Sequence, residues 1–264
     1  MSKRGRVIIL GVTTVLTCAA VAFFPRIPQP LAYHSFADHR TFLGVPNFFD
    51  VVSNVPFLIV GLWGLVCVAM RAVGRDSAFI VPAERWPYVI PAAGVVMTCF
   101  GSAYYHLAPG NARLVWDRLP MTLGFMSLLS AMLMERVNLR AGLMALGPLL
   151  ALGLASVVAW YASERRGAGD LRFYLVTQYY TLLLIILILW LFPPRYTRGG
   201  DWIVAMGFYV LAKVLEVSDR RIFSWGHILS GHTLKHLAAA LGVYWIFRML
   251  ARRRPIKSLP EQLA

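Results

Sequence analysis

The stretch RFYLVTQYYTLLLIILILWLF, residues 172–192, carries no charged side chain after its first residue, Arg172. A helix needs about 20 mostly apolar residues to cross the hydrocarbon core of a bilayer, so this stretch predicts a transmembrane helix. Similar apolar stretches recur along the chain and predict seven further spans, at residues 7–24, 48–71, 87–108, 117–134, 141–161, 201–217 and 230–248.

The composition agrees with a membrane protein and excludes several other classes. Of the 264 residues, 58% are hydrophobic and 14% are charged, whereas a soluble domain carries about 25% charged residues. The three cysteines (Cys18, Cys67 and Cys99) lie inside apolar stretches, which is typical of thiols that pack as small hydrophobic side chains. An ordinary soluble enzyme, a disordered chain and a disulfide-rich domain are therefore excluded.

The net charge of +14 would suggest nucleic-acid binding in a soluble protein. Here the basic residues gather in short segments between apolar stretches, which is typical of loops at a charged membrane surface, so we expect no nucleic-acid partner. Alternate segments also differ in their Lys and Arg content, and the set that includes both termini is the richer one. The positive-inside rule therefore places both termini in the cytoplasm.

The sequence predicts an all-α, multi-pass membrane protein of the plasma-membrane or inner-membrane type. We expect an N-terminal transmembrane anchor over residues 1–30, a seven-helix bundle over 31–250 and a basic cytoplasmic tail over 251–264. The first segment has a second interpretation. Basic residues precede its apolar stretch and the small residues AAVA (19–22) end it, as in a cleaved signal peptide.

Two histidines, His232 and His236, lie four residues apart in the last predicted span. This spacing places both imidazoles on one face of a helix, where they could bind one metal ion. The pair alone fits equally well two histidines hydrogen-bonded at a helix interface. No Glu follows His232 as it would in a thermolysin-type motif, so a general base would have to come from elsewhere.

A second polar group lies where the third predicted span ends and the fourth begins. Ser102 and His106 are four residues apart, and Asp117 follows after a tight turn. Taken singly, Ser102 fits a small residue that lets two helices approach, and Asp117 fits a carboxylate favoured at a helix N-terminus.

The alternating direction of successive membrane spans places these residues on one side of the membrane. The third span ends at His106, on the side of the membrane where the fourth and the eighth spans begin. All five polar residues are therefore expected at a similar depth on the same side of the membrane, whatever the sign of the topology, and the positive-inside rule makes this the exterior side. Three imidazoles with one open position are typical of a catalytic zinc site, so we predict that His106, His232 and His236 bind zinc.

These residues resemble the alkaline ceramidase family, within the CREST superfamily of membrane hydrolases and adiponectin-receptor-like proteins. The resemblance covers about residues 33–250. It rests on GSAYYH (101–106) with Asp117, GHTLKH (231–236) and PNFFDVVSN (46–54). The family has a seven-helix core around zinc, which implies that the span at 7–24 is an N-terminal addition.

The resemblance also implies roles for the site residues. His106, His232 and His236 would bind zinc, Asp117 would orient or deprotonate the water on the metal, and Ser102 would help to stabilise the oxyanion. General chemistry agrees, because zinc activates water, a carboxylate can return the proton to a leaving amine, and a hydroxyl can stabilise an oxyanion.

Ceramidases of this family carry a calcium site before their first core helix, which makes Asp38 and Asn47 possible calcium ligands here. Few other acids lie in this segment and Arg40 intrudes, whereas calcium prefers several oxygen ligands. The alternative is an ordered exterior loop in which Asp38 and Arg40 pair.

Other polar residues inside the predicted spans have weaker signals. Lys213 and Glu216 are expected to neutralise each other, and Lys235 to point away from the histidines toward a lipid headgroup. Ser53 and Asn54 are expected to form interhelical hydrogen bonds. Gln178, Tyr179 and Tyr180 fit either a substrate cavity or aromatic packing.

The sequence thus predicts a zinc-dependent amidohydrolase that takes a ceramide-like lipid from the bilayer. Two alternatives stay open: a non-enzymatic, zinc-stabilised membrane protein resembling the adiponectin receptors, and a lipid esterase or remodelling enzyme with the same site. A transporter is the least favoured interpretation, because the spans lack paired broken helices.

Overall fold

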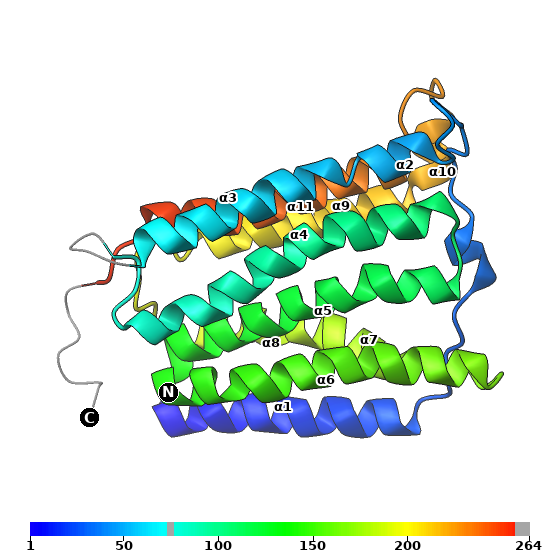
Figure 1. The fold of residues 1–264 in the computed structure, drawn as a ribbon. Coiled ribbons are helices and arrows are strands. Elements are labelled where there is room, and N and C mark those ends of the chain that lie inside the picture. The colour runs from blue at the N-terminus through cyan, green and yellow to red at the C-terminus, as the bar shows by residue number, and fades with distance from the viewer. Residues whose placement is uncertain (73–76, 257–264) are drawn as a thin grey trace.

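The computed structural model describes residues 1–72 and 77–256, and these form one bundle of long helices (Figure 1). Each apolar stretch predicted as a span lies in a long helical segment. The long helices are α1 (Lys3–Phe23), α3 (Val55–Arg71), α4 (Trp86–Leu107), α5 (Asn111–Met132), α6 (Leu139–Arg165), α8 (Thr181–Leu191), α9 (Asp201–Val217) and α11 (Gly231–Arg252).

Shorter helical elements extend or connect these helices. The short α2 (Phe48–Val52) precedes α3, so that residues 48–71 form one apolar segment. A π-helical turn, η4 (Val176–Tyr180), joins α7 (Arg172–Leu175) to α8, and a second, η3 (Leu133–Val137), follows α5. The others are the 3₁₀ turns η1 (Leu31–His34) and η2 (Pro82–Arg85) and the short helix α10 (Asp219–Phe223).

Six helical segments of the described chain are long and apolar enough to cross a membrane: 3–23, 48–71, 82–107, 139–165, 172–191 and 231–252. This finding supports the prediction of a multi-pass membrane protein. The predicted spans at 117–134 and 201–217 are the helices α5 and α9, which do not meet the same criterion. Helix α9 has 17 residues, and α5 carries Asp117 and Arg118 in its second turn.

The helices pack as an incomplete ring. In chain order α3 packs on α4, α4 on α5 and α5 on α6, while α11 packs between α3 and α9. Helix α1 lies at the outside of the bundle in Figure 1, and its closest helical partner is α8. Leu10 is the one residue of α1 that is buried, so nearly all of this apolar helix is left to face lipid.

The link between α1 and the bundle is largely polar. Arg172, at the start of α7, donates hydrogen bonds to the carbonyl oxygens of Val21 and Ala22 at distances of 3.1 and 3.3 Å. The Asp170 carboxylate pairs with the same guanidinium. The Thr14 and Tyr180 hydroxyls are 2.7 Å apart and hydrogen-bonded. Arg172 therefore caps carbonyl groups at the C-terminal end of α1, where the helix itself cannot satisfy all of them.

The bundle extends further toward the C-terminus than the sequence predicts. Helix α11 continues to Arg252, and the Arg253 side chain is fully buried. The backbone of Arg254 and Ile256 then pairs with residues 195–197. The first six residues of the predicted cytoplasmic tail, 251–256, thus belong to the bundle, and the remaining part, 257–264, lies outside the described residues.

Helices α4 and α5 approach most closely at Gly101. A Cβ atom placed there would lie 2.0 Å from the carbonyl oxygen of Trp116, a backbone atom that cannot rotate away. A side chain at this position would push α4 away from α5 beside His106 and Asp117. The glycine is therefore required for the spacing of the two helices at the candidate site.

We predict that Gly101→Ala lowers the stability of the protein by about 1–3 kcal/mol, the usual cost of overpacking. The matched control is Gly124→Ala on α5, because no atom lies within 4 Å of a Cβ at that position. The midpoints of thermal unfolding in detergent should fall for Gly101→Ala and stay level or rise for Gly124→Ala. Equal midpoints for the two variants would contradict the close approach.

Candidate metal centre

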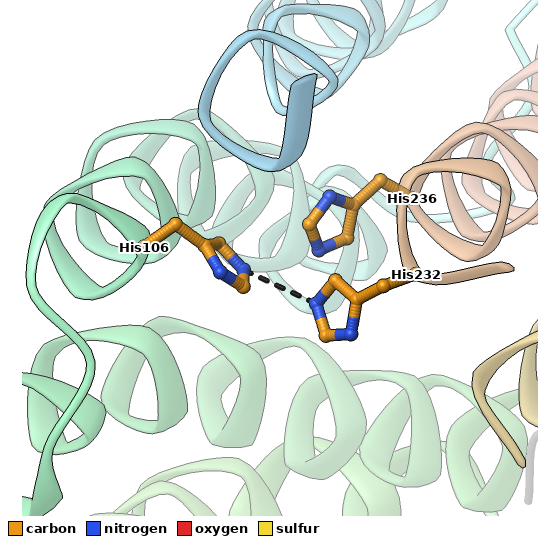
Figure 2. Close-up of side chains that lie close together, drawn as sticks. All are labelled: His106, His232 and His236. Atoms are coloured by element: carbon orange, nitrogen blue, oxygen red, sulfur yellow. Dashed lines mark hydrogen bonds between the residues drawn. The ribbon is translucent and has the colours of Figure 1, made fainter. Parts of the chain in front are cut away.

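Three histidines from two distant parts of the chain meet inside the bundle (Figure 2). His106 comes from the last turn of α4, and His232 and His236 come from the first two turns of α11. The Nε2 atoms of His106 and His232 are 3.3 Å apart, and one ligand atom of each histidine lies within 4.8 Å of the other two. All three side chains are buried, and the group could hold a metal ion.

Two buried carboxylates fix the start of α11. Ser230 caps the helix by accepting the Thr233 N–H, and the hydroxyls of Ser230 and Thr233 both donate to Asp50. The backbone N–H of His232 donates to the Asp219 carboxylate at 2.7 Å. These bonds use the unpaired N–H groups of the first helical turn. They fix the start of α11, and with it the positions of His232 and His236, relative to Asp50 and Asp219.

A hydrogen-bond chain sets the tautomer of His236. The Ser53 hydroxyl donates to the carbonyl oxygen of Asp50 and lies 2.7 Å from the Nδ1 atom of His236. A hydroxyl has a single proton, so the Nδ1–H of His236 donates to Ser53. The Nε2 atom of His236 then carries the free lone pair, as required of a metal ligand whose other nitrogen is held by a hydrogen bond.

One distance within the group is compatible with two ligands of a shared zinc ion. Two nitrogen atoms bound at about 2.0–2.1 Å to one tetrahedral zinc ion are themselves roughly 3.3 Å apart, which is the distance between the Nε2 atoms of His106 and His232. Neutral imidazole is a zinc ligand, and three protein ligands leave one position for water or substrate. The donor set therefore suits a zinc ion better than calcium, which prefers oxygen.

An aromatic side chain of the loop between α1 and α2 covers the group. The Phe36 ring packs against the rings of His106 and His232, with centroid distances of 4.6 and 4.4 Å. Tyr105 packs against Phe36, and its hydroxyl is hydrogen-bonded to His34 at 2.9 Å. The loop between α1 and α2 thus limits the access of water to the histidines.

The structure places Ser102 and Asp117 beside each other at the α4–α5 contact. Ser102 is buried one turn before His106 on α4, and the backbone of Asp117 on α5 lies against the preceding residue, Gly101. Asp117 is not one of the three residues that could share a metal ion. Both residues lie at the end of the bundle that contains the histidines.

The side chains of Asp38 and Asn47, the possible calcium ligands, are both engaged in hydrogen bonds within the protein. Both oxygens of Asp38 accept hydrogen bonds from the Arg40 guanidinium, at 2.8 and 2.7 Å. The Asn47 amide is hydrogen-bonded to His39 and to the His106 carbonyl. Burial alone would raise the pKa of Asp38, but the hydrogen bonds from Arg40 outweigh burial and hold this pKa below its ordinary value. The alternative of a paired exterior loop is the one observed.

Several residues around the histidines were not identified as site residues from sequence. Ser53 is predicted to bond another helix, but nothing in the sequence shows that its partner is His236, and Asn54 bonds instead to Asp50 in its own segment. Asp219 is predicted at the exterior surface and is in fact buried. The sequence feature that could have identified Asp50 as a site residue is a carboxylate inside an apolar stretch. No feature of the sequence indicates that Phe36 packs over the histidines.

The chain matches no known protein family, and no curated protein matches it in sequence. The case for the candidate site therefore rests on its own residues: three converging buried imidazoles, the hydrogen bonds that hold them, and a serine and an aspartate on the adjoining helices.

Proposed function

We propose that the protein is a zinc-dependent integral-membrane hydrolase that cleaves the amide bond of a ceramide-like lipid to a fatty acid and a long-chain base. The observation that carries this proposal is the group of three buried histidines, with two Nε2 atoms 3.3 Å apart, inside an apolar bundle. The proposal also rests on the resemblance of the GSAYYH and GHTLKH segments and Asp117 to the alkaline ceramidase family.

His106, His232 and His236 would hold the metal through one nitrogen each. A zinc ion there would supply a Lewis acid for the acyl carbonyl and would activate water as a nucleophile near neutral pH. The Ser53 hydroxyl keeps His236 in the tautomer that binds metal, and Asp219 holds the backbone of His232 in place.

Asp117 and Ser102 would carry the proton transfer and the charge stabilisation. Asp117 would take a proton from the attacking water and return it to the leaving amine, as a general base and then a general acid. Ser102 would donate a hydrogen bond to the oxyanion that develops on the carbonyl oxygen. Phe36, which packs over two of the histidines, would keep bulk water from the reacting atoms.

We further propose that α5 and α9 cross the membrane together with the six apolar segments, because both pack along other helices of the bundle. The protein then has eight spans, a seven-helix core and α1 as an addition. Both termini lie in the cytoplasm and the histidines lie toward the exterior face. The end of α11 that contains Arg252 lies at the same end of the bundle as the start of α1 (Figure 1), as this topology requires.

One observation favours a second candidate function, a zinc-stabilised membrane protein without enzymatic activity. The Phe36 ring closes over the histidines, and closed coordination is typical of structural zinc sites. In that case the metal would tie α4 to α11, and Asp117 would have no chemical role.

Asp117→Asn separates the two candidates. In a hydrolase the variant should keep its zinc, because Asp117 is not a ligand, and should lose about 10²–10⁴-fold in kcat toward a ceramide, the usual worth of a general base. Asp170→Asn makes the same chemical change in the pair with Arg172, in the segment before α7, and should retain turnover. Metal analysis together with release of fatty acid measures both properties. Wild-type turnover in Asp117→Asn would refute the role of this carboxylate.

A further inference from the structure

A lysine–glutamate cluster, Lys213, Glu216 and Lys235, lies on the helices beside the histidines. Lys235 on α11 donates to Glu216 on α9 at 2.6 Å, and Lys213 donates to the other oxygen of the same carboxylate. The Lys235 side chain therefore does not point to a headgroup as the sequence predicts, but bonds the neighbouring helix. Lys213 pairs with Glu216 as expected.

The two lysines are not equivalent. The pair of Lys235 and Glu216 joins α11 to α9 and is electrically neutral. Lys213 lies on the same helix as Glu216, three residues away, so it adds a positive charge without joining any further helix. A charged side chain inside a membrane costs about 2.5–3.5 kcal/mol, and a structural tie between the helices does not need this second cation.

The other carboxylates around the histidines already have donors of their own. Asp219 accepts the backbone N–H groups of Ala37 and His232. Asp50 accepts hydroxyl groups of α11. Within the part of the chain that the structure describes, Glu216 is the carboxylate that pairs with Lys213. This carboxylate is shared with Lys235, so the charge of Lys213 is left available to a ligand.

Lys213 faces a polar wall formed by the π-helical turn η4. Its Nζ atom lies 5.8 Å from the centre of the Tyr179 ring, and Gln178 donates to the Tyr209 hydroxyl at 3.2 Å. Turns of this kind occur frequently at functional sites. Here the turn presents the Tyr179 ring beside Lys213, whose side chain has about a third of its surface exposed.

The same turn also lines an apolar groove against α1. The groove has a volume of about 330 Å³, and its walls include Val21, Ile27, Leu175, Val176 and Tyr179. Tyr179 thus separates a cation on one side from an apolar groove on the other. A ligand that fills both places has an anionic headgroup and an acyl chain.

We propose that Lys213 is a specificity-determining residue that binds the anionic headgroup of the lipid substrate, with an acyl chain in the groove between α1 and η4. The preferred substrate is then a ceramide-like lipid amide that carries a phosphate or carboxylate in its headgroup. The lipid is a substrate only if the proposed hydrolase is correct. The binding of its headgroup by Lys213 does not depend on turnover.

Binding of decyl phosphate by the full-length, zinc-loaded protein in a non-ionic detergent tests the assignment. Titration of the intrinsic tryptophan fluorescence should show that decyl phosphate binds at least about 10-fold more tightly than either decanol or inorganic phosphate. Lys213→Met should remove the preference over decanol, and Lys213→Arg should keep it. Both variants leave the pair of Lys235 with Glu216, so their zinc content should equal that of the wild type.

Equal affinities of the wild type for decyl phosphate and decanol would overturn the assignment, whether or not any variant folds. Equal affinities for decyl phosphate and inorganic phosphate would show that the site binds free phosphate and not the headgroup of a lipid. A protein that binds decyl phosphate through Lys213 but hydrolyses no lipid amide would refute the hydrolase and leave this site standing. Hydrolysis of neutral ceramide, unchanged in Lys213→Met, would refute this site alone.

Discussion

His236→Ala is expected to lose both bound metal and all detectable hydrolysis of lipid amides. The variant removes one of three nitrogen ligands that lie within 4.8 Å of one another, and two imidazoles do not complete the three-ligand set of a catalytic zinc site. Metal analysis of the purified protein and an assay of fatty-acid release measure the two losses. His227→Ala, at an exposed position in the loop before α11, is the matched control and should keep both properties.

Ser53→Ala provides a graded version of the same test. The variant leaves all three ligands but removes the hydroxyl that accepts the Nδ1–H of His236. Loss of such a supporting hydrogen bond typically lowers metal affinity by about 10–100-fold. A competition titration with a zinc chelator should therefore rank the affinities as wild type, Ser53→Ala and His236→Ala. Stoichiometric zinc in His236→Ala would show that the three histidines do not share one ion.

The second large effect is expected at the opposite end of the bundle, from Arg253→Met. Arg253 is fully buried, donates to Glu135 and to the Tyr88 hydroxyl, and stacks on the Tyr196 ring with its guanidinium carbon 4.1 Å from the ring centre. Removal of one partner leaves an unpaired buried charge, which typically costs 3–5 kcal/mol. The midpoint of thermal unfolding should fall sharply, whereas Arg252→Met, at an exposed neighbouring position, should change it little.

A double variant separates the lost pair from the lost packing. Glu135→Gln in the Arg253→Met background removes the remaining charge, so it should recover part of the lost stability, because replacing both members of a buried ion pair is often close to neutral. An Arg253→Met protein as stable as the wild type would mean that the ion pair contributes nothing to the fold. The zinc content of the folded fraction should not change, because the pair lies away from the histidines.

The sequence predicts the helices and the meeting of the histidines because both depend on local patterns. Apolar stretches of bilayer length mark the helices, and the four-residue spacing of His232 and His236 fixes their shared face. The alternating direction of successive membrane spans then brings His106 to the same side. Helix α5 begins at Asn111, six residues before the predicted 117, because hydropathy marks the apolar part of a helix and not its polar first turns.

The contacts that hold the site could not be predicted in the same way. The bond between Lys235 and Glu216 and the packing of Phe36 over the histidines depend on how helices rotate against each other, and no spacing within one segment encodes that rotation. The burial of Arg253 follows from a partner more than a hundred residues earlier, Glu135. The basic residues at the end of this helix do not indicate such a partner, and they are typical of a solvated tail.

The loose attachment of α1 has a consequence for biogenesis. The ribosome makes α1 first, yet the residues that hold it, Arg172 and Tyr180, are synthesised about 150 residues later. Throughout that interval the hydrogen bonds of α1 to Arg172 and Tyr180 cannot form. Before these contacts form, the surface of α1 must be compatible with acyl chains. This requirement agrees with the apolar sequence of α1 and with the burial of Leu10 alone among its residues.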